Sequence, residues 1–146
     1  MLKALLFAAA LLAASPALAQ TAADTDKKID DVLGGPHAIY ATAIQTIETA
    51  VANHDLQTIA GYFSFGDPIK VDGADVTIGD LDELTAKFDT LFTSKVISAV
   101  RSQKYENLMV SADGIMFGDG ELWISGVCDD DACQNPFINI IAINTK

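Results

Sequence analysis

The spacing of apolar residues changes after Ser94, and that change is the strongest constraint on the fold of this chain. The part before it carries one stripe with the i, i+3, i+4, i+7 spacing of a helix that buries a single face. Its members are Tyr40, Ala43, Ile44, Ile47, Ala50 and Val51. The part after Ser94 consists of short β-rich runs separated by turn residues. Helices first and strands last predict an α+β fold, with N-terminal helices packed on a curved antiparallel sheet.

The stripe predicts a helix that begins at Pro36, since proline suits the first helical position, and that turns Glu48 toward solvent. Asp55 is a candidate N-cap for a short second helix. Residues 69–78 read as two very short strands around the hairpin dipeptide Asp72-Gly73. Asp80 then resembles the cap of a third helix, which runs from about residue 81 to 93.

After Ser94 the chain is predicted to be extended. Residues 96–101 and 105–110 form either one long bent strand or two strands, and residues 115–117 and 121–127 form further strands with a bulge between them. Residues 137–143 make the last strand. The part of the chain after Ser94 is therefore predicted to form an antiparallel meander.

Residues 1–19 have the layout of a secretory signal peptide. Lys3 supplies the positive charge, an apolar run follows to Ala14, and Ala17-Leu18-Ala19 is a small-x-small cleavage site. The apolar run is shorter than the roughly 20 residues that span a bilayer. We therefore expect cleavage after Ala19 and a periplasmic or secreted protein. Residues 20–35 are expected to form a flexible leader or frayed helix, and residues 36–146 a single domain.

The two cysteines, Cys128 and Cys133, are separated by four residues. In an exported protein an even number of closely spaced cysteines indicates a disulfide. A zinc site needs further ligands, and His37 and His54 lie far away in the predicted helical region. The sequence therefore predicts a structural disulfide.

The chain is strongly acidic, with 9 basic residues against 20 acidic ones and a formal charge of −11. This charge repels nucleic acids and anionic membranes, so neither is an expected partner. It favours a cationic ligand or protein partner, although it also serves solubility alone. The acidic clusters lack the spacing of a calcium-binding loop, and we predict no metal and no cofactor.

From Pro36 to Asn144 the chain resembles the NTF2-like (cystatin-like, SnoaL-type) superfamily. The resemblance rests on Asn53-His54-Asp55, on Tyr62-Phe63, and on the order of helices, small hairpin and C-terminal meander. Residues 113–124 are similar to a strand pair in many uncharacterised exported bacterial members. The resemblance implies a cone in which a curved sheet wraps helices around a pocket. The superfamily includes isomerases, dehydratases, hydrolases and binding modules, so the fold does not transfer a function.

The candidate pocket residues are Tyr40, Tyr62, Asp67, Glu121 and Trp123. None of them matches a catalytic motif of the superfamily, so no catalytic residue is assigned. Glu121 and Trp123 alternate onto one face of a strand, where a carboxylate beside an indole would favour a cationic ligand. The alternative is a packed Trp123 with Glu121 at the solvated rim.

Three functions follow from these observations. The first is an exported domain that binds a small molecule or a protein partner without catalysis, as a homodimer through its sheet. The second is a cofactor-free pocket enzyme with Asp67 or Glu121 as base and Tyr62 or Tyr40 as proton donor. The third is an acidic inhibitor or immunity-type protein that binds a basic enzyme, with residues 129–131 as the first candidate contact.

Overall fold

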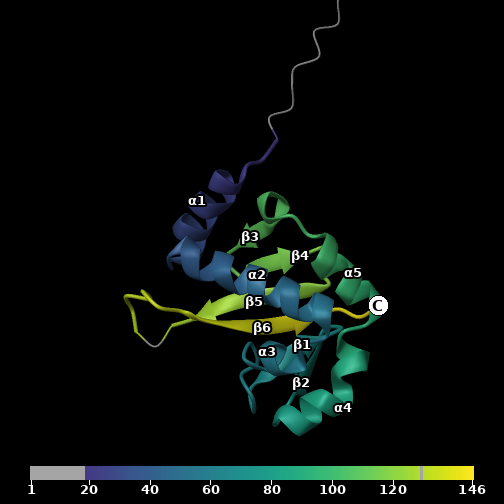
Figure 1. Cartoon of the computed structure of the whole chain (residues 1–146). Coiled ribbons are helices and arrows are strands. Elements are labelled where there is room, and N and C mark those ends of the chain that lie inside the picture. The colour runs from purple at the N-terminus through teal and green to yellow at the C-terminus, as the bar shows by residue number, and fades with distance from the viewer. Residues whose placement is uncertain (1–18, 129) are drawn as a thin grey trace, which may run out of the picture.

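A computed structural model describes residues 19–128 and 130–146, so the predicted signal peptide lies outside the described residues except for Ala19. Within the described residues, three helices, a small hairpin and two further helices precede a meander of strands (Figure 1). The helices are α1 (Ala22–Leu33), α2 (His37–Asn53), α3 (Leu56–Ala60), α4 (Leu81–Leu91) and α5 (Ser94–Ser102), followed by the 3₁₀ turn η1 (Tyr105–Asn107). The strands are β1 (Pro68–Val71), β2 (Ala74–Thr77), β3 (Met109–Ser111), β4 (Gly114–Phe117), β5 (Leu122–Val127) and β6 (Phe137–Ile143).

The strands form one six-stranded sheet in the order β2-β1-β6-β5-β4-β3. The sheet is mixed, which corrects the prediction of an antiparallel sheet: β1 and β6 run parallel, with Lys70 opposite Ala142, and the other neighbours are antiparallel. The reason lies in the connection, because after β2 the chain passes through α4 and α5 to the far edge of the sheet. It then returns strand by strand until β6 lies beside β1, and a parallel pair always needs such a long crossover.

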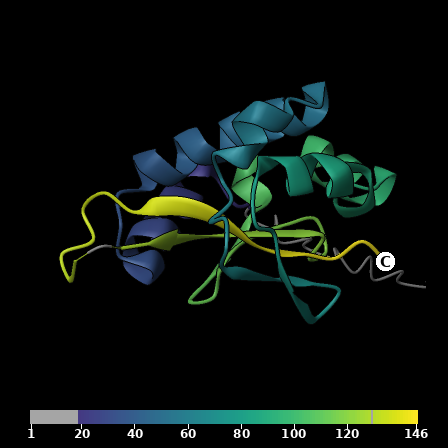
Figure 2. The same cartoon turned by 90° about the horizontal axis from the view of Figure 1, so that it is seen from below.

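Helices α2 to α5 lie over one face of this sheet (Figure 2). The side chains of Ile115, Ile124 and Ile140 occupy matching positions on three neighbouring strands, and each is at most 1% exposed. The predicted stripe of α2 is buried as expected. The core therefore lies between this helical layer and one face of the sheet, as in other α+β domains.

Short polar side chains set the helix boundaries, as predicted. Asp55 accepts a hydrogen bond from the backbone N–H of Thr58 at the start of α3, and Asp80 does the same for Glu83 at the start of α4. His54 ends α2 in the left-handed conformation, with φ of 54°. These caps fix the α2–α3 corner that forms one end of the site described below.

Residues 96–101 are helical, so the predicted strand there is wrong. Val96 and Val100 lie one helical turn apart on α5, and both are fully buried. Valine has a high strand propensity, but burial of a helical face outweighs a preference of this size. The next predicted strand, residues 105–110, begins with η1, and only its end belongs to β3.

Residues 22–33 form the helix α1 where the sequence predicts a flexible leader or frayed helix. Thr21 and Asp24 make a reciprocal capping box at its start, and Gly34 ends it in the left-handed conformation. Ile29 is 0% exposed and belongs to the core. The helix is therefore an integral part of the domain.

The β5–β6 hairpin extends beyond the body of the protein, and its loop is closed by a disulfide between Cys128 and Cys133 (Figure 1). The two Cα atoms are 5.0 Å apart. This confirms the predicted disulfide and fits a secreted protein. In the described part of the chain, no helix is both long and apolar enough to cross a membrane.

Candidate functional site

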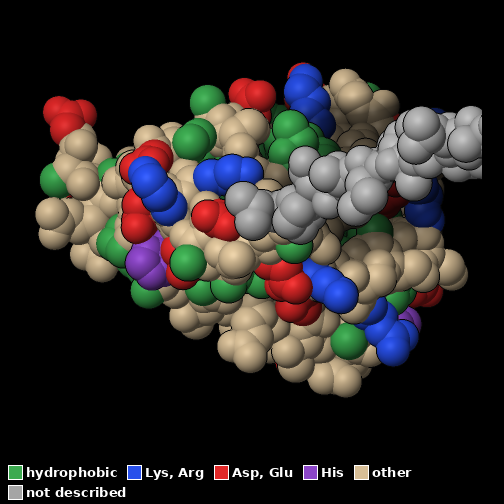
Figure 3. Space-filling view, turned by 90° about the horizontal axis from the view of Figure 1, so that it is seen from above, with side chains coloured by type: hydrophobic (Ala, Val, Ile, Leu, Met, Phe, Trp, Pro, Cys, Tyr) green, Lys and Arg blue, Asp and Glu red, His purple; other side chains and the backbone are tan. Residues whose placement is uncertain are grey.

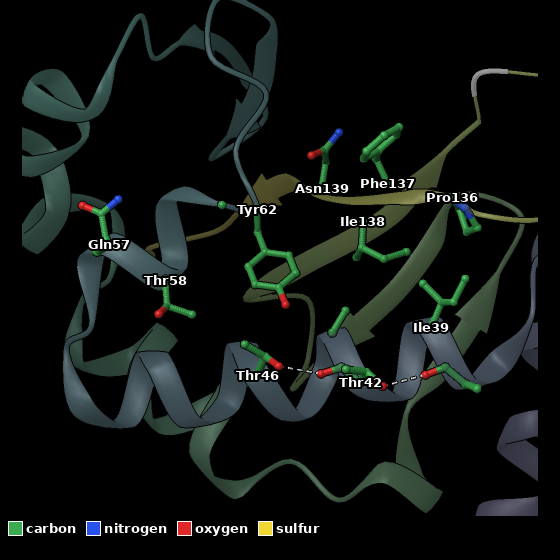
Figure 4. A pocket seen from close by; sticks show the side chains of 13 residues that line it. Ile39, Thr42, Thr46, Gln57, Thr58, Tyr62, Pro136, Phe137, Ile138 and Asn139 are labelled. Carbon is green, nitrogen blue, oxygen red and sulfur yellow. Dashed lines mark hydrogen bonds between the residues drawn. The ribbon is translucent and has the colours of Figure 1, made fainter.

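A groove of about 820 Å³ lies between α2, the segment after α3, and the start of β6 (Figure 4). Its volume falls within the roughly 300–1,000 Å³ typical of ligand sites. Small side chains on the groove walls leave this space open, notably Ala38, Ala43 and Gly61. The remaining lining residues are Ile39, Thr42, Thr46, Gln57, Thr58, Tyr62, Pro136, Phe137, Ile138 and Asn139.

One wall of the groove is the edge of β6. The backbone N–H of Ile140 points to this side, because it donates to the carbonyl of Tyr62 at 2.7 Å. Directions alternate along a strand, so the N–H and C=O of Ile138 point the same way. On β6, strand β1 pairs only with Ala142 and Ile143, which lie farther along the strand. Among the described residues, β6 therefore has no strand partner on this side before Ile140.

The threonine hydroxyls of the groove already make hydrogen bonds within their own helices or helix caps. Thr42 and Thr46 donate to the carbonyls one turn earlier, at 2.9 and 2.8 Å, and the Thr58 hydroxyl donates to Asp55 at 2.7 Å. In Figure 4 the Tyr62 ring points from its loop toward α2, as does Ile138 from β6. The groove therefore presents mainly apolar surface and the strand edge.

Carboxylates flank the groove, whereas its lining residues are uncharged. Asp55 lies beyond the α3 end, and hydrogen bonds from Thr58 hold the pKa of its carboxyl below the usual range. The exposed Asp130 and Asp131 lie in the disulfide loop that precedes Pro136, and acidic side chains mark the tip of this loop in Figure 3. Carboxylates thus lie toward both ends of the groove.

Of the five predicted pocket residues, Tyr62 lines this groove. Tyr40 lies in the core with 1% exposure, and a Cβ atom at Gly126 would lie 2.3 Å from its hydroxyl oxygen. Burial raises the pKa of the Tyr40 hydroxyl, an effect partly offset by a hydrogen bond with the Gly126 backbone. Asp67 lies in an exposed turn, where it accepts a hydrogen bond from the Ser64 hydroxyl at 2.7 Å.

Glu121 lies in the turn before β5 and is 7% exposed. Its carboxylate accepts a hydrogen bond from the N–H of Asp119 at 2.6 Å and lies 3.3 Å from the ammonium of Lys95. Burial is the largest single influence and raises the pKa of Glu121, but the hydrogen bonds and Lys95 together lower it below the usual value. The carboxylate is thus a satisfied ion pair beside α5.

Trp123 occupies a different environment. It pairs in register with Met116 on one side and Ala142 on the other, on the face of the sheet opposite the buried Leu122 and Ile124. Glu121 turns instead toward α5, so the predicted arrangement of a carboxylate beside the indole on one strand face is not formed. The prediction that Glu121 and Trp123 share one strand face is wrong, because Glu121 belongs to the turn, where strand alternation does not apply.

Sequence reasoning missed Glu48, which was expected to face solvent. It is half-buried on α2, and its Oε1 atom has no hydrogen-bond partner among the described residues. Burial raises the pKa of its carboxyl. It lines a small hollow of about 290 Å³ together with Tyr105. The local sequence does not indicate that Glu48 is half-buried, because η1, which covers this side of α2, lies 57 residues farther along the chain.

A polar cluster outside the groove joins α1, α2 and η1. The hydroxyl of Tyr105 donates to Asp26 at 2.7 Å, and the imidazole Nδ1 of His37 lies 2.8 Å from Asp30. The hydrogen bond to Asp30 raises the pKa of His37. Across the described residues, no three His, Cys, Asp or Glu side chains converge in a way that could hold a metal ion.

Comparisons with protein-family models, curated proteins and solved structures each found no match.

Proposed function

We propose that this protein is an exported, non-catalytic binding domain whose ligand occupies the groove between α2 and β6. The observation that carries the proposal is the groove itself, which combines about 820 Å³ of space with an uncharged, largely apolar lining. Its lining lacks a carboxylate or histidine that could exchange a proton with a bound ligand. Such a site suits binding better than proton-transfer chemistry.

An NTF2-like cone is part of this proposal. It is supported by the order of the elements and by the helices gathered on one face of the sheet. In such a cone the ligand enters between the helices and the sheet, where the groove also lies.

We further propose that two copies associate through the opposite face of the sheet. Met109, Met116 and Trp123 are register neighbours there, and Met109 is 50% exposed. Exposed apolar side chains that adjoin on one face are typical of protein interfaces. Sedimentation equilibrium tests the association: a single monomeric species at micromolar concentration would contradict it.

The groove is tested with two matched alanine substitutions on α2. Ala38 lines the groove and Ala52 does not, and both side chains are exposed. Ala38→Trp is expected to fill the groove and reduce binding of the neutral apolar dye Nile red by about tenfold or more, the scale set by 1.4 kcal/mol of lost binding energy. Ala52→Trp is expected to leave binding unchanged. Equal dye binding by both variants would contradict the proposed site.

A further inference from the structure

We infer that the natural occupant of this groove is an extended segment of a partner protein, which pairs with the free edge of β6 as an added strand. This inference rests on the proposed function and specifies its ligand. It commits to a peptide with apolar residues at its centre and basic residues at both ends.

Hydrogen-bonding groups of the β6 edge favour an added strand. The Ile140 N–H is bonded to Tyr62, but the N–H and C=O of Ile138 point into the groove without a strand partner among the described residues. Unpaired N–H and C=O groups on a strand edge form a template for pairing with another chain. An extended chain supplies one donor and one acceptor at the spacing that Ile138 requires.

The shape of the groove favours the same occupant. An added strand lies about 4.8 Å from its neighbour and turns alternate side chains to opposite faces. On the helix side those side chains would meet Ile39, Ala43 and Tyr62. This wall is apolar, and its alanine leaves room for a branched side chain. The lining thus favours alternate apolar residues in the bound segment.

The charges around the groove favour basic residues at the ends of the bound segment. The lining carries no lysine or arginine, the flanking groups include Asp55, Asp130 and Asp131, and the whole chain has a formal charge of −11. A segment with basic ends would place its charges near these carboxylates. Such complementarity raises the association rate and opposes acidic competitors.

The test titrates capped, unlabelled synthetic peptides into the mature protein and measures binding by isothermal titration calorimetry. The peptide acetyl-KVTVTVK-amide is expected to bind about tenfold more tightly than its acidic-ended counterpart acetyl-EVTVTVE-amide, with the difference reduced by salt. Two N-methylated versions block the N–H groups of one peptide edge or the other. One version is expected to lose about tenfold in affinity, the scale of one or two hydrogen bonds, and the other to bind normally, since only one edge faces β6.

Amide hydrogen exchange supplies a readout at the site itself. Bound peptide is expected to slow exchange of the Ile138 amide about tenfold or more, while the Ile140 amide, already bonded to Tyr62, changes little. Unchanged exchange at Ile138, equal binding of both N-methylated peptides, or no peptide binding would overturn strand addition. Protection of Ile138 that depends on protein concentration alone would identify a second copy as the occupant instead, and would also overturn it.

These outcomes are separable from failure of the proposed function. If Nile red binding is lost in Ala38→Trp and retained in Ala52→Trp, but the peptides fail, the groove remains a binding site and only the peptide assignment falls. If the dye does not distinguish the two variants, the proposed site itself falls.

Discussion

At the scale of single residues, His37 joins the first two helices through its contacts with acidic groups on α1. Its backbone N–H and its imidazole both contact Asp30, each at 2.8 Å, and Asp26 lies 4.0 Å from the other ring nitrogen. Because Asp26 also accepts the Tyr105 hydroxyl, the cluster connects α1, α2 and η1. The contacts are solvent-exposed, so their strength depends on the protonation of the imidazole.

This arrangement predicts a pH-dependent stability. The pKa of His37 is raised in the folded protein, so the protonated imidazole stabilises the fold fully below its ordinary pKa of about 6.5. The stabilisation is lost as the pH rises through the higher folded-state pKa. We expect His37→Gln to destabilise the protein more at pH 6 than at pH 8.5, as measured by urea unfolding. An equal effect at both pH values would contradict this role.

Residue identity alone identified some parts of the candidate site and not others. The Asp55 cap follows from a local pattern, because a cap depends on neighbouring residues. Tyr62, which lines the groove, was a candidate because Tyr62-Phe63 resembles an aromatic pair of the NTF2-like superfamily. The position of Tyr40 depends on Gly126, which is distant in the sequence and packs against its hydroxyl. The buried oxygen of Glu48 likewise depends on a remote segment. Local sequence does not carry such information.

At the scale of elements, helix α1 contributes a buried side chain to the core of the domain. It is amphipathic and its Ile29 is 0% exposed, whereas Val32 on the same helix is 44% exposed. Its charged residues obscured the helical signal in the sequence, since the segment resembles a polar leader. The long, regular stripe of α2 was predicted correctly because its period is sustained over several turns. Helix α5 was missed because its two buried valines give too short a pattern to outweigh strand propensity.

The contribution of α1 can be measured with two truncations on this helix. Ile29→Ala is expected to lower the free energy of unfolding by about 2–5 kcal/mol, because it leaves a cavity in the core. Val32→Ala is expected to change it by about 0.5 kcal/mol or less, as is usual at an exposed position. Chemical denaturation measures both. Small and equal effects would mean that α1 does not contribute to the core.

At the scale of the whole molecule, the disulfide lies at the end of the β5–β6 hairpin, away from the core. Replacement of both Cys128 and Cys133 by serine is expected to destabilise the protein by about 2 kcal/mol, the loop-entropy effect of so short a ring. The circular dichroism spectrum is expected to stay unchanged. Global unfolding of this double variant would mean that the disulfide holds more than its own loop.

The partly covered edge of β6 also bears on how the protein avoids polymerising. An open strand edge is ordinarily a template on which whole sheets stack into aggregates. Here α2 stands over one side of that edge, and the Tyr62 segment closes it at Ile140. We therefore expect α2 and the Tyr62 segment to hinder a second folded sheet from pairing with Ile138 more than they hinder a single extended chain.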